Sequence, residues 1–139
     1  MNKKFEQISL KPGFMKHNGG IFFKTVSEKE FEFKATIKEN HLNAAGIAHG
    51  GFIAAVVDAG AGTAAHKSVD QNPCVTVSLE LKFISVVKLG QELIGKTKIQ
   101  KKTKSMIFLT CELTASNKIV ATASGVWKIL KLPGAGSGG

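Results

Sequence analysis

The stretch that decides the fold runs from residue 49 to residue 65 and reads HGGFIAAVVDAGAGTAA. Its length and alanine content predict a helix from Gly50 to about Lys67, and this helix is apolar on almost every side. A helix that is apolar all round is expected to be buried all round. Asp58 stands in its middle, where an uncompensated carboxylate costs several kcal/mol. We therefore expect Asp58 to be paired, exposed in a pocket or used in catalysis.

Strand-like segments stand on both sides of this helix. Residues 21–26 and 31–38 precede it, and in the second of these Phe31, Phe33, Ala35 and Ile37 alternate with polar residues. Residues 75–87, 93–103, 106–114 and 119–130 follow it. Two strands, a helix and four more strands predict an α+β fold, in which a curved antiparallel sheet wraps around one central buried helix. Residues 2–9 are predicted to form a short helix that ends at Lys11-Pro12-Gly13.

Length and charge restrict the class of protein. The 139 residues fit one domain, which we place at residues 1–132, and residues 133–139 have the composition of a flexible tail or linker. The net charge is +9 and all 19 basic residues are lysine. Because arginine is the preferred residue for phosphate and base contacts in nucleic-acid recognition, no nucleic-acid partner is expected. The scattered lysines are expected first of all to form a solvated, soluble surface; the alternative is that their positive field attracts a polyanionic substrate.

Cysteines and apolar runs indicate the compartment. Cys74 and Cys111 show neither metal-ligand spacing nor a disulfide framework, so we expect reduced thiols, no metal and a cytoplasmic protein. The first residues carry no signal-peptide pattern. The longest apolar run is interrupted by Asp58 and is too short to span a bilayer, so no membrane association is expected.

Gly50 and Gly51 fall at the predicted start of the helix. The first N–H groups of a helix have no partner within it and lie at its positive end, where they can hold a carbonyl oxygen that becomes negative in a transition state. Eight residues separate Gly50 from Asp58, which is about 12 Å along a helix axis. One small carbonyl cannot touch both groups of a single straight helix. If both act on one bond they come from different subunits, which predicts an obligate dimer with two shared sites.

Other polar residues near the helix leave alternatives open. The Asn43 side chain binds a water or a ligand carbonyl, or it closes its own loop as an Asx turn. The Thr76 hydroxyl holds a nucleophilic water, or Thr76 is an ordinary strand residue. We expect His49 to hydrogen-bond the backbone and shape the turn beside the site, and we assign no role to His41.

Several of these residues together form a pattern. It comprises Asn43-x-x-Gly46-x-x-His49-Gly50-Gly51, then Asp58, then Val75-Thr76-Val77, Leu79-x-Leu81-x-Phe83, Gly90 and residues 119–123. Over roughly residues 20–130 the chain resembles the hot-dog-fold acyl-CoA thioesterases of the phenylacetic-acid-degradation (PaaI-like) type. Asparagine, His-Gly-Gly and aspartate at these spacings are a more specific signal together than any one of them alone.

The resemblance implies hydrolysis of acyl-CoA thioesters to free acid and CoA, with no metal or cofactor. It also implies dimers that pair sheet edges, and commonly dimers of dimers. It gives Asp58 the role of general base or nucleophile, and Gly50 that of an N–H donor to the thioester oxygen, with Gly51 beside it in substrate binding. It places Asn43 next to the reacting centre and gives Thr76 a part in positioning the water. In the family, the aspartate and the glycine come from opposite subunits.

The chain departs from the family pattern after Phe83. Many relatives have an aliphatic residue, arginine and proline there, whereas this chain has Ile84, Ser85 and Val86. Where that arginine helps to hold the CoA phosphates, Ser85 cannot. Lys82, Lys88 or the lysines in residues 101–104 are the candidates to replace it.

The sequence leaves two other functions to consider. The first is a non-catalytic acyl-CoA-binding or regulatory module, against which the intact set of Asn43, Gly50 and Asp58 argues, since a binder needs no base. The second is a hydratase of the same fold, because residues 70–73 partly match an Asp-x-Asn-Pro element. The histidine of that element would fall at Val75, so we interpret the match as a coincidental turn.

Overall fold

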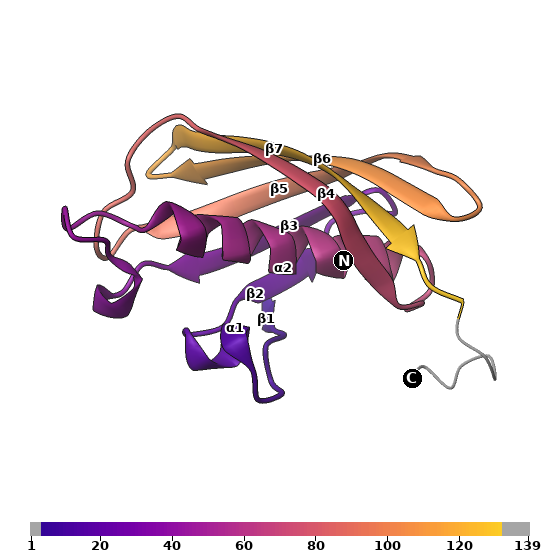
Figure 1. Cartoon of the computed structure of the whole chain (residues 1–139), viewed down its shortest axis with the longest axis horizontal. Coiled ribbons are helices and arrows are strands. Elements are labelled where there is room, and N and C mark those ends of the chain that lie inside the picture. Colours follow the sequence, from indigo (N-terminus) through magenta and orange to yellow (C-terminus); the bar gives the residue numbers. More distant parts are fainter. Residues whose placement is uncertain (1–3, 132–139) are drawn as a thin grey trace.

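The computed structural model describes residues 4–131. One long helix lies under a curved seven-stranded sheet, whose strand order is β1-β2-β3-β5-β6-β7-β4 (Figure 1). All neighbouring strands are antiparallel. The elements are β1 (Glu6–Gln7), α1 (Phe14–His17), β2 (Phe22–Thr25), β3 (Glu30–Thr36), the 3-10 helix η1 (Glu39–His41), α2 (Gly50–Ser68), β4 (Cys74–Phe83), β5 (Glu92–Lys102), β6 (Met106–Ala115) and β7 (Lys118–Ile129). The predicted α+β arrangement of a sheet around a central helix is confirmed.

The N-terminal prediction was wrong. Of the predicted helix at residues 2–9, residues 2 and 3 lie outside the described part. Residues 4–9 form no helix and contain the short strand β1, which pairs with the edge of β2. The helix α1 lies after Pro12-Gly13 instead of before it. The edge of β2 has unpaired backbone N–H and C=O groups, and a nearby segment can form hydrogen bonds with them. Helix propensity is a local property of the sequence, so it does not include this pairing. The predicted tail at residues 133–139 also lies outside the described residues, so the boundary at residue 132 stays a prediction.

The close approach of α2 to the sheet depends on two glycines around one ring. Phe33 of β3 is fully buried, between Gly60 of α2 and Gly95 of β5. A Cβ at either glycine would overlap the Phe33 ring. Because neither glycine has a Cβ, the Phe33 ring fills the space between the helix and the strand. The packing of this ring sets the distance between α2 and the sheet.

The sheet covers only one side of α2. Val56, Val57 and Ala61 are fully buried under it, whereas a stripe of small residues on the other side is half-buried or exposed. This open stripe comprises residues 51, 54, 55, 58 and 59. The prediction of burial on every side is therefore wrong for the single chain, because one sheet can cover only about half of a helix surface. Asp58 lies on the open stripe.

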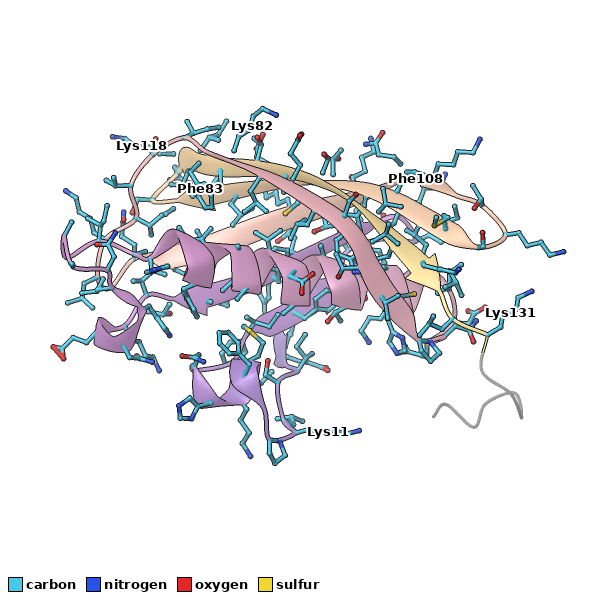
Figure 2. The ribbon with its side chains drawn as sticks, in the orientation of Figure 1. Lys11, Lys82, Phe83, Phe108, Lys118 and Lys131 are labelled. Atoms are coloured by element: carbon cyan, nitrogen blue, oxygen red, sulfur yellow. The ribbon has the colours of Figure 1, made fainter. Side chains whose placement is uncertain are left out.

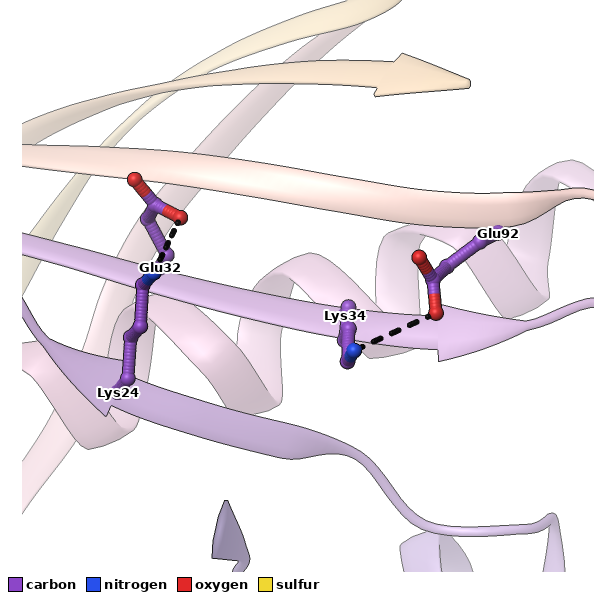
Figure 3. Close-up of polar contacts among 4 residues, drawn as sticks. All are labelled: Lys24, Glu32, Lys34 and Glu92. Atoms are coloured by element: carbon purple, nitrogen blue, oxygen red, sulfur yellow. Dashed lines mark ion pairs between the residues drawn. The ribbon is translucent and has the colours of Figure 1, made fainter. Parts of the chain in front are cut away.

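The outer face of the sheet is polar where β2, β3 and β5 meet. Lys24 pairs with Glu32 at 3.6 Å, and Lys34 pairs with Glu92 at 3.5 Å (Figure 3). Partly exposed surface pairs of this kind contribute little to stability individually, and they show that this face is polar in the single chain. No helix within residues 4–131 has the length and apolar character that crossing a membrane requires.

Candidate active site

The carboxylate in the helix is paired with a hydroxyl from the neighbouring strand. Thr76 Oγ1, in β4, donates a hydrogen bond to Asp58 Oδ1, in α2, over 2.7 Å. Both residues are exposed in the single chain. Of the three fates expected for Asp58, the structure therefore shows pairing together with exposure. One carboxylate oxygen is occupied by Thr76, and the other is left for a further partner.

An irregularity in β4 aims Thr76 at the helix. Thr76 lies opposite Trp127 in β7, but Ser78 lies opposite the preceding residue, Val126, so β4 holds one extra residue here. Leu79, three residues after Thr76, packs against the core. In a regular strand, residues three apart point to opposite faces. The β-bulge changes this parity and places both Thr76 and Leu79 on the helix side.

The start of α2 holds a backbone N–H without a partner. His49 is the N-cap, and its Nδ1 accepts a hydrogen bond from the Gly51 N–H at 2.8 Å. The Phe52 and Ile53 N–H groups bond to the His49 carbonyl oxygen. Within residues 4–131, the Gly50 N–H makes no hydrogen bond. Gly50 is thus the open donor at this helix end, whereas the Gly51 N–H is already used by His49.

The histidine roles expected from the sequence agree with this geometry. His49 shapes the turn as anticipated, and because its Nδ1 accepts a hydrogen bond, the neutral ring carries its proton on Nε2. His41 is 3% exposed and stacks on Phe52 with 3.6 Å between the ring centroids. Its Nδ1 accepts from the Lys38 N–H and its Nε2 contacts the Asn18 carbonyl oxygen at 2.7 Å. His41 is therefore a structural residue beneath the loop that leads to α2.

Asn43 follows the Asx-turn alternative with its oxygen. Asn43 Oδ1 accepts from the Ala45 N–H at 2.9 Å and from the Ile47 N–H at 3.3 Å. The side-chain NH₂ group makes no hydrogen bond within the described chain. The loop thus holds the carboxamide in place by its oxygen, which leaves a donor available for a ligand.

Two of the lysines proposed for CoA, Lys82 and Lys88, lie away from the Asp58–Thr76 pair. Lys82 is exposed and pairs with Glu80 at 3.4 Å. Six residues of strand, about 20 Å, separate Lys82 from Thr76. Figure 2 shows Lys82 on the outer side of the sheet, away from α2. Lys88 is exposed in the loop between β4 and β5, so neither lysine joins the pair within one chain.

One residue of the site was not anticipated. Phe83 lies beside Gly50, such that a Cβ on this glycine would be 3.6 Å from the ring. The Phe83 side chain is 55% exposed. The alternating pattern of β4 signalled only that Phe83 shares a face with Leu79 and Leu81, and it gave no indication of contact with the helix start.

Within one chain, then, the structure brings together Asp58 and Thr76 but not Gly50. Helix α2 runs without a break from Gly50 to Ser68, so the separation of about 12 Å between Gly50 and Asp58 holds.

Residues 45–122 match the family model described as the thioesterase superfamily. The matched segment spans more than half of the chain. The chain belongs to the thioesterase superfamily. The matched segment contains Gly50, Asp58 and Thr76, and Asn43 lies just before it.

Individual relatives agree with this membership. The Pseudomonas aeruginosa protein named Putative esterase PA0474 is 33% identical over 112 residues, which cover 80% of this chain and 84% of the relative. Human acyl-coenzyme A thioesterase 13 is 31% identical over 87 residues, covering 61% of this chain and 62% of the relative. The chain is therefore a thioester hydrolase.

Solved structures confirm the fold. Zebra fish thioesterase superfamily member 2 superposes with a TM-score of 0.79 at 22% identity, over 88% of this chain and 90% of that one. The Escherichia coli PaaI protein from the phenylacetic acid degradation operon gives a TM-score of 0.75 at 19% identity, over 82% of each chain. The predicted hot-dog fold and the PaaI-like resemblance are confirmed.

Proposed function

We propose that the protein hydrolyses acyl-CoA thioesters at sites shared between two copies of the chain. The observation that carries this proposal is the hydrogen bond from Thr76 to Asp58 on the open stripe of α2. A carboxylate fixed in position by a hydroxyl, with its second oxygen unoccupied, can accept a proton from a water placed beside it. The relative named acyl-coenzyme A thioesterase 13 supports acyl-CoA as the substrate class.

A second copy supplies what one chain lacks. β4 is the last strand of the sheet, so one of its edges is free, and Val75 and Val77 on it are 44% and 54% exposed. Antiparallel pairing of two β4 edges would extend the sheet and bring two α2 helices side by side in opposite directions. The open stripes would then cover each other, and Gly50 of one copy would lie beside Asp58 of the other. A dimer, and a tetramer made of two such dimers, are part of this proposal.

The hydrogen-bond directions suggest how the water is held. The Thr76 hydroxyl donates its hydrogen bond to Asp58, so the hydroxyl oxygen is free to accept a hydrogen bond from a water. The second oxygen of Asp58 accepts a hydrogen bond from the other O–H of that water. The lone pair of the water oxygen then points to the thioester carbon. Asp58 takes the water proton as the C–O bond forms, and the oxyanion is held by the Gly50 N–H of the other copy. Collapse breaks the C–S bond, and the proton on Asp58 passes to the departing thiolate.

The remaining residues support this arrangement. The Asn43 NH₂ group is available to orient the acyl or the pantetheine part of the substrate. His49 fixes the first turn of α2 and so keeps the Gly50 N–H pointing out of the helix end. In the alternative mechanism Asp58 attacks the thioester directly and forms an anhydride, which water then hydrolyses.

The test is an acyl-CoA panel with thiol detection. Wild-type protein should release CoA, and Asp58→Asn should keep its fold while kcat falls by about two orders of magnitude or more. Glu112→Gln, an exposed carboxylate on β6, is the matched control and should keep wild-type kinetics. Wild-type-like turnover by Asp58→Asn would remove Asp58 from the mechanism. Tight binding of acyl-CoA without turnover by the wild type would favour the non-catalytic module instead.

A further inference from the structure

We propose that a lysine-lined hollow at the carboxyl end of α2 binds the phosphorylated nucleotide of CoA. This inference rests on the proposed function and deepens it by assigning the part of the substrate that does not react. The hollow, called the lysine basin below, has a volume of about 890 Å³ and is lined by His66 and by residues 68–73, 102–104 and 129–131.

The charge of the lysine basin suits a polyanion. Lys102, Lys104 and Lys131 line it, and Asp70 is the one acidic residue among the described residues of its wall. A neighbouring hollow shares Lys104 and Lys131 and adds Lys128. In Figure 2, Lys131 lies at the opposite end of the sheet from Lys82. The positive charge of this end is therefore separate from Lys82, the residue before Phe83.

Hydrogen bonds between distant segments hold the basin open. Lys102 Nζ donates to the Ser68 carbonyl oxygen at 2.8 Å. The Leu130 N–H donates to the Pro73 carbonyl oxygen at 2.8 Å. One bond ties the end of α2 to the end of β5, and the other ties the residue before β4 to the residue after β7, before any ligand is present. Preformed concave sites of this kind are typical of small-molecule binding.

The position of the basin relative to the reacting pair defines the shape of its ligand. Helix α2 carries Asp58 and ends in the basin wall at Ser68. Strand β4 starts directly after Pro73 of the wall and carries Thr76. From Asp58 to His66 the helix rises about 12 Å. A substrate that fills the basin and reacts at Asp58 must therefore have a polyanionic end, a reactive thioester and an arm of about this length between them.

CoA thioesters have this construction. The phosphorylated adenosine is separated from the sulfur by the extended pantetheine arm. The basin offers three lysines, Lys102, Lys104 and Lys131, whereas Lys82 is engaged with Glu80. An acidic carrier protein would present the same arm, but a protein partner needs about 800 Å² of matched surface. A concave hollow favours the compact nucleotide.

The experiment compares two thioesters with the same acyl group, an acyl-CoA and the corresponding acyl-pantetheine, which lacks the nucleotide. The test variant is Lys104→Ala/Lys131→Ala, and the control is Lys96→Ala/Lys118→Ala, which removes the same charge from exposed positions outside the basin. We expect the KM for acyl-CoA to rise about tenfold in the test variant with kcat within about twofold of wild type. The KM for acyl-pantetheine should not change, and the control should match wild type for both substrates.

Direct binding separates this inference from the proposed function. Adenosine 3′,5′-bisphosphate should bind wild-type protein in calorimetry, and its affinity for the test variant should be about tenfold lower. Both results are expected even if the protein hydrolyses neither thioester. No binding of the bisphosphate would overturn the inference. Equal changes for the two thioesters, or equal effects of the test and control variants, would also overturn it. A loss confined to thioesters of an acidic acyl carrier protein would reassign the basin to a protein partner.

Discussion

The ring of Phe83 lies against Gly50, at the distance where a Cβ on this glycine would make an ordinary 3.6 Å contact. Gly50 is therefore a position where a side chain fits and where only the N–H is needed for the proposed reaction. It is the first residue of α2 after its N-cap. Proline is favoured at this helix position and lacks the N–H. His49 has φ −67° and ψ 130°, an extended conformation that suits a residue before proline.

Gly50→Pro should therefore keep the helix and lose the oxyanion donor. We expect kcat to fall about 10²- to 10³-fold, which is the usual cost of one such donor. Gly50→Ala keeps the N–H and should stay within about threefold of wild type. Steady-state kinetics with one good acyl-CoA, together with circular dichroism to check the helix, distinguishes the two. If both variants were equally active, the Gly50 N–H would have no part in the reaction.

Mixing two inactive variants tests the shared site. In a mixture of Asp58→Asn and Gly50→Pro chains, half of the randomly exchanged dimers are mixed. One of the two sites in each mixed dimer then has both Asp58 and the Gly50 N–H. Activity should return to about a quarter of the wild-type value, because half of the dimers have one of two sites intact. A mixture that stays inactive after demonstrated subunit exchange would place both groups in the same chain's site, contrary to the proposal.

Thr76 can be tested with an isosteric change. Thr76→Val removes the hydroxyl that bonds Asp58 and keeps the shape, so kcat should fall about 10- to 100-fold. Thr76→Ser keeps a hydroxyl on the same bulged backbone and should retain most of the activity. A valine variant with wild-type kcat would show that Thr76 is only a strand residue.

The packing of α2 against Phe33 predicts a stability difference between two glycines of one helix. Gly60→Ala forces a Cβ into the Phe33 ring and should cost about 1–3 kcal/mol in the free energy of unfolding. At Gly62 the new Cβ would lie 3.3 Å from Trp127 Nε1, and the gain in helix propensity partly offsets this contact. Chemical denaturation should therefore show a larger loss for Gly60→Ala. The reverse order would mean that Phe33 moves aside without cost.

The two cysteines should differ in reactivity. Burial raises the pKa of the Cys111 thiol from its ordinary 9.0 to about 12, and burial also raises the pKa of Cys74, which is only partly covered. Since the thiolate is the reactive form, iodoacetamide at pH 8 should label native Cys74 before Cys111, as peptide mass spectrometry would show. In denaturant both should react alike.

The same shift predicts a pH dependence of stability. An unfolded Cys111 ionises near pH 9 while the folded thiol stays neutral to about pH 12. The stability that the neutral Cys111 thiol contributes to the folded state is therefore fully present below pH 9 and is lost as the pH rises towards 12. Denaturation curves of wild type and Cys111→Ala should accordingly converge as the pH rises above 9.

The sequence by itself determined the elements and the candidates. Residues 49–65 predicted α2, the alternation of Phe31, Phe33, Ala35 and Ile37 predicted the buried face of β3, and a carboxylate in an apolar helix singled out Asp58. These predictions held because hydrophobic period and composition are local properties of the chain. The spacing from Gly50 to Asp58 also held, since helix rise follows from residue number alone.

Only the tertiary structure decided which groups meet. The side of the sheet on which Thr76 lies depends on a bulge against β7, and the open stripe of α2 depends on how far one sheet reaches around a helix. The strand β1 replaced a predicted helix because the edge of β2 was there to pair with. The lysine basin joins His66 and residues 68–73, 102–104 and 129–131, which are far apart in the sequence. Each of these features is set by pairing and packing between distant segments, and no local period or propensity encodes such contacts.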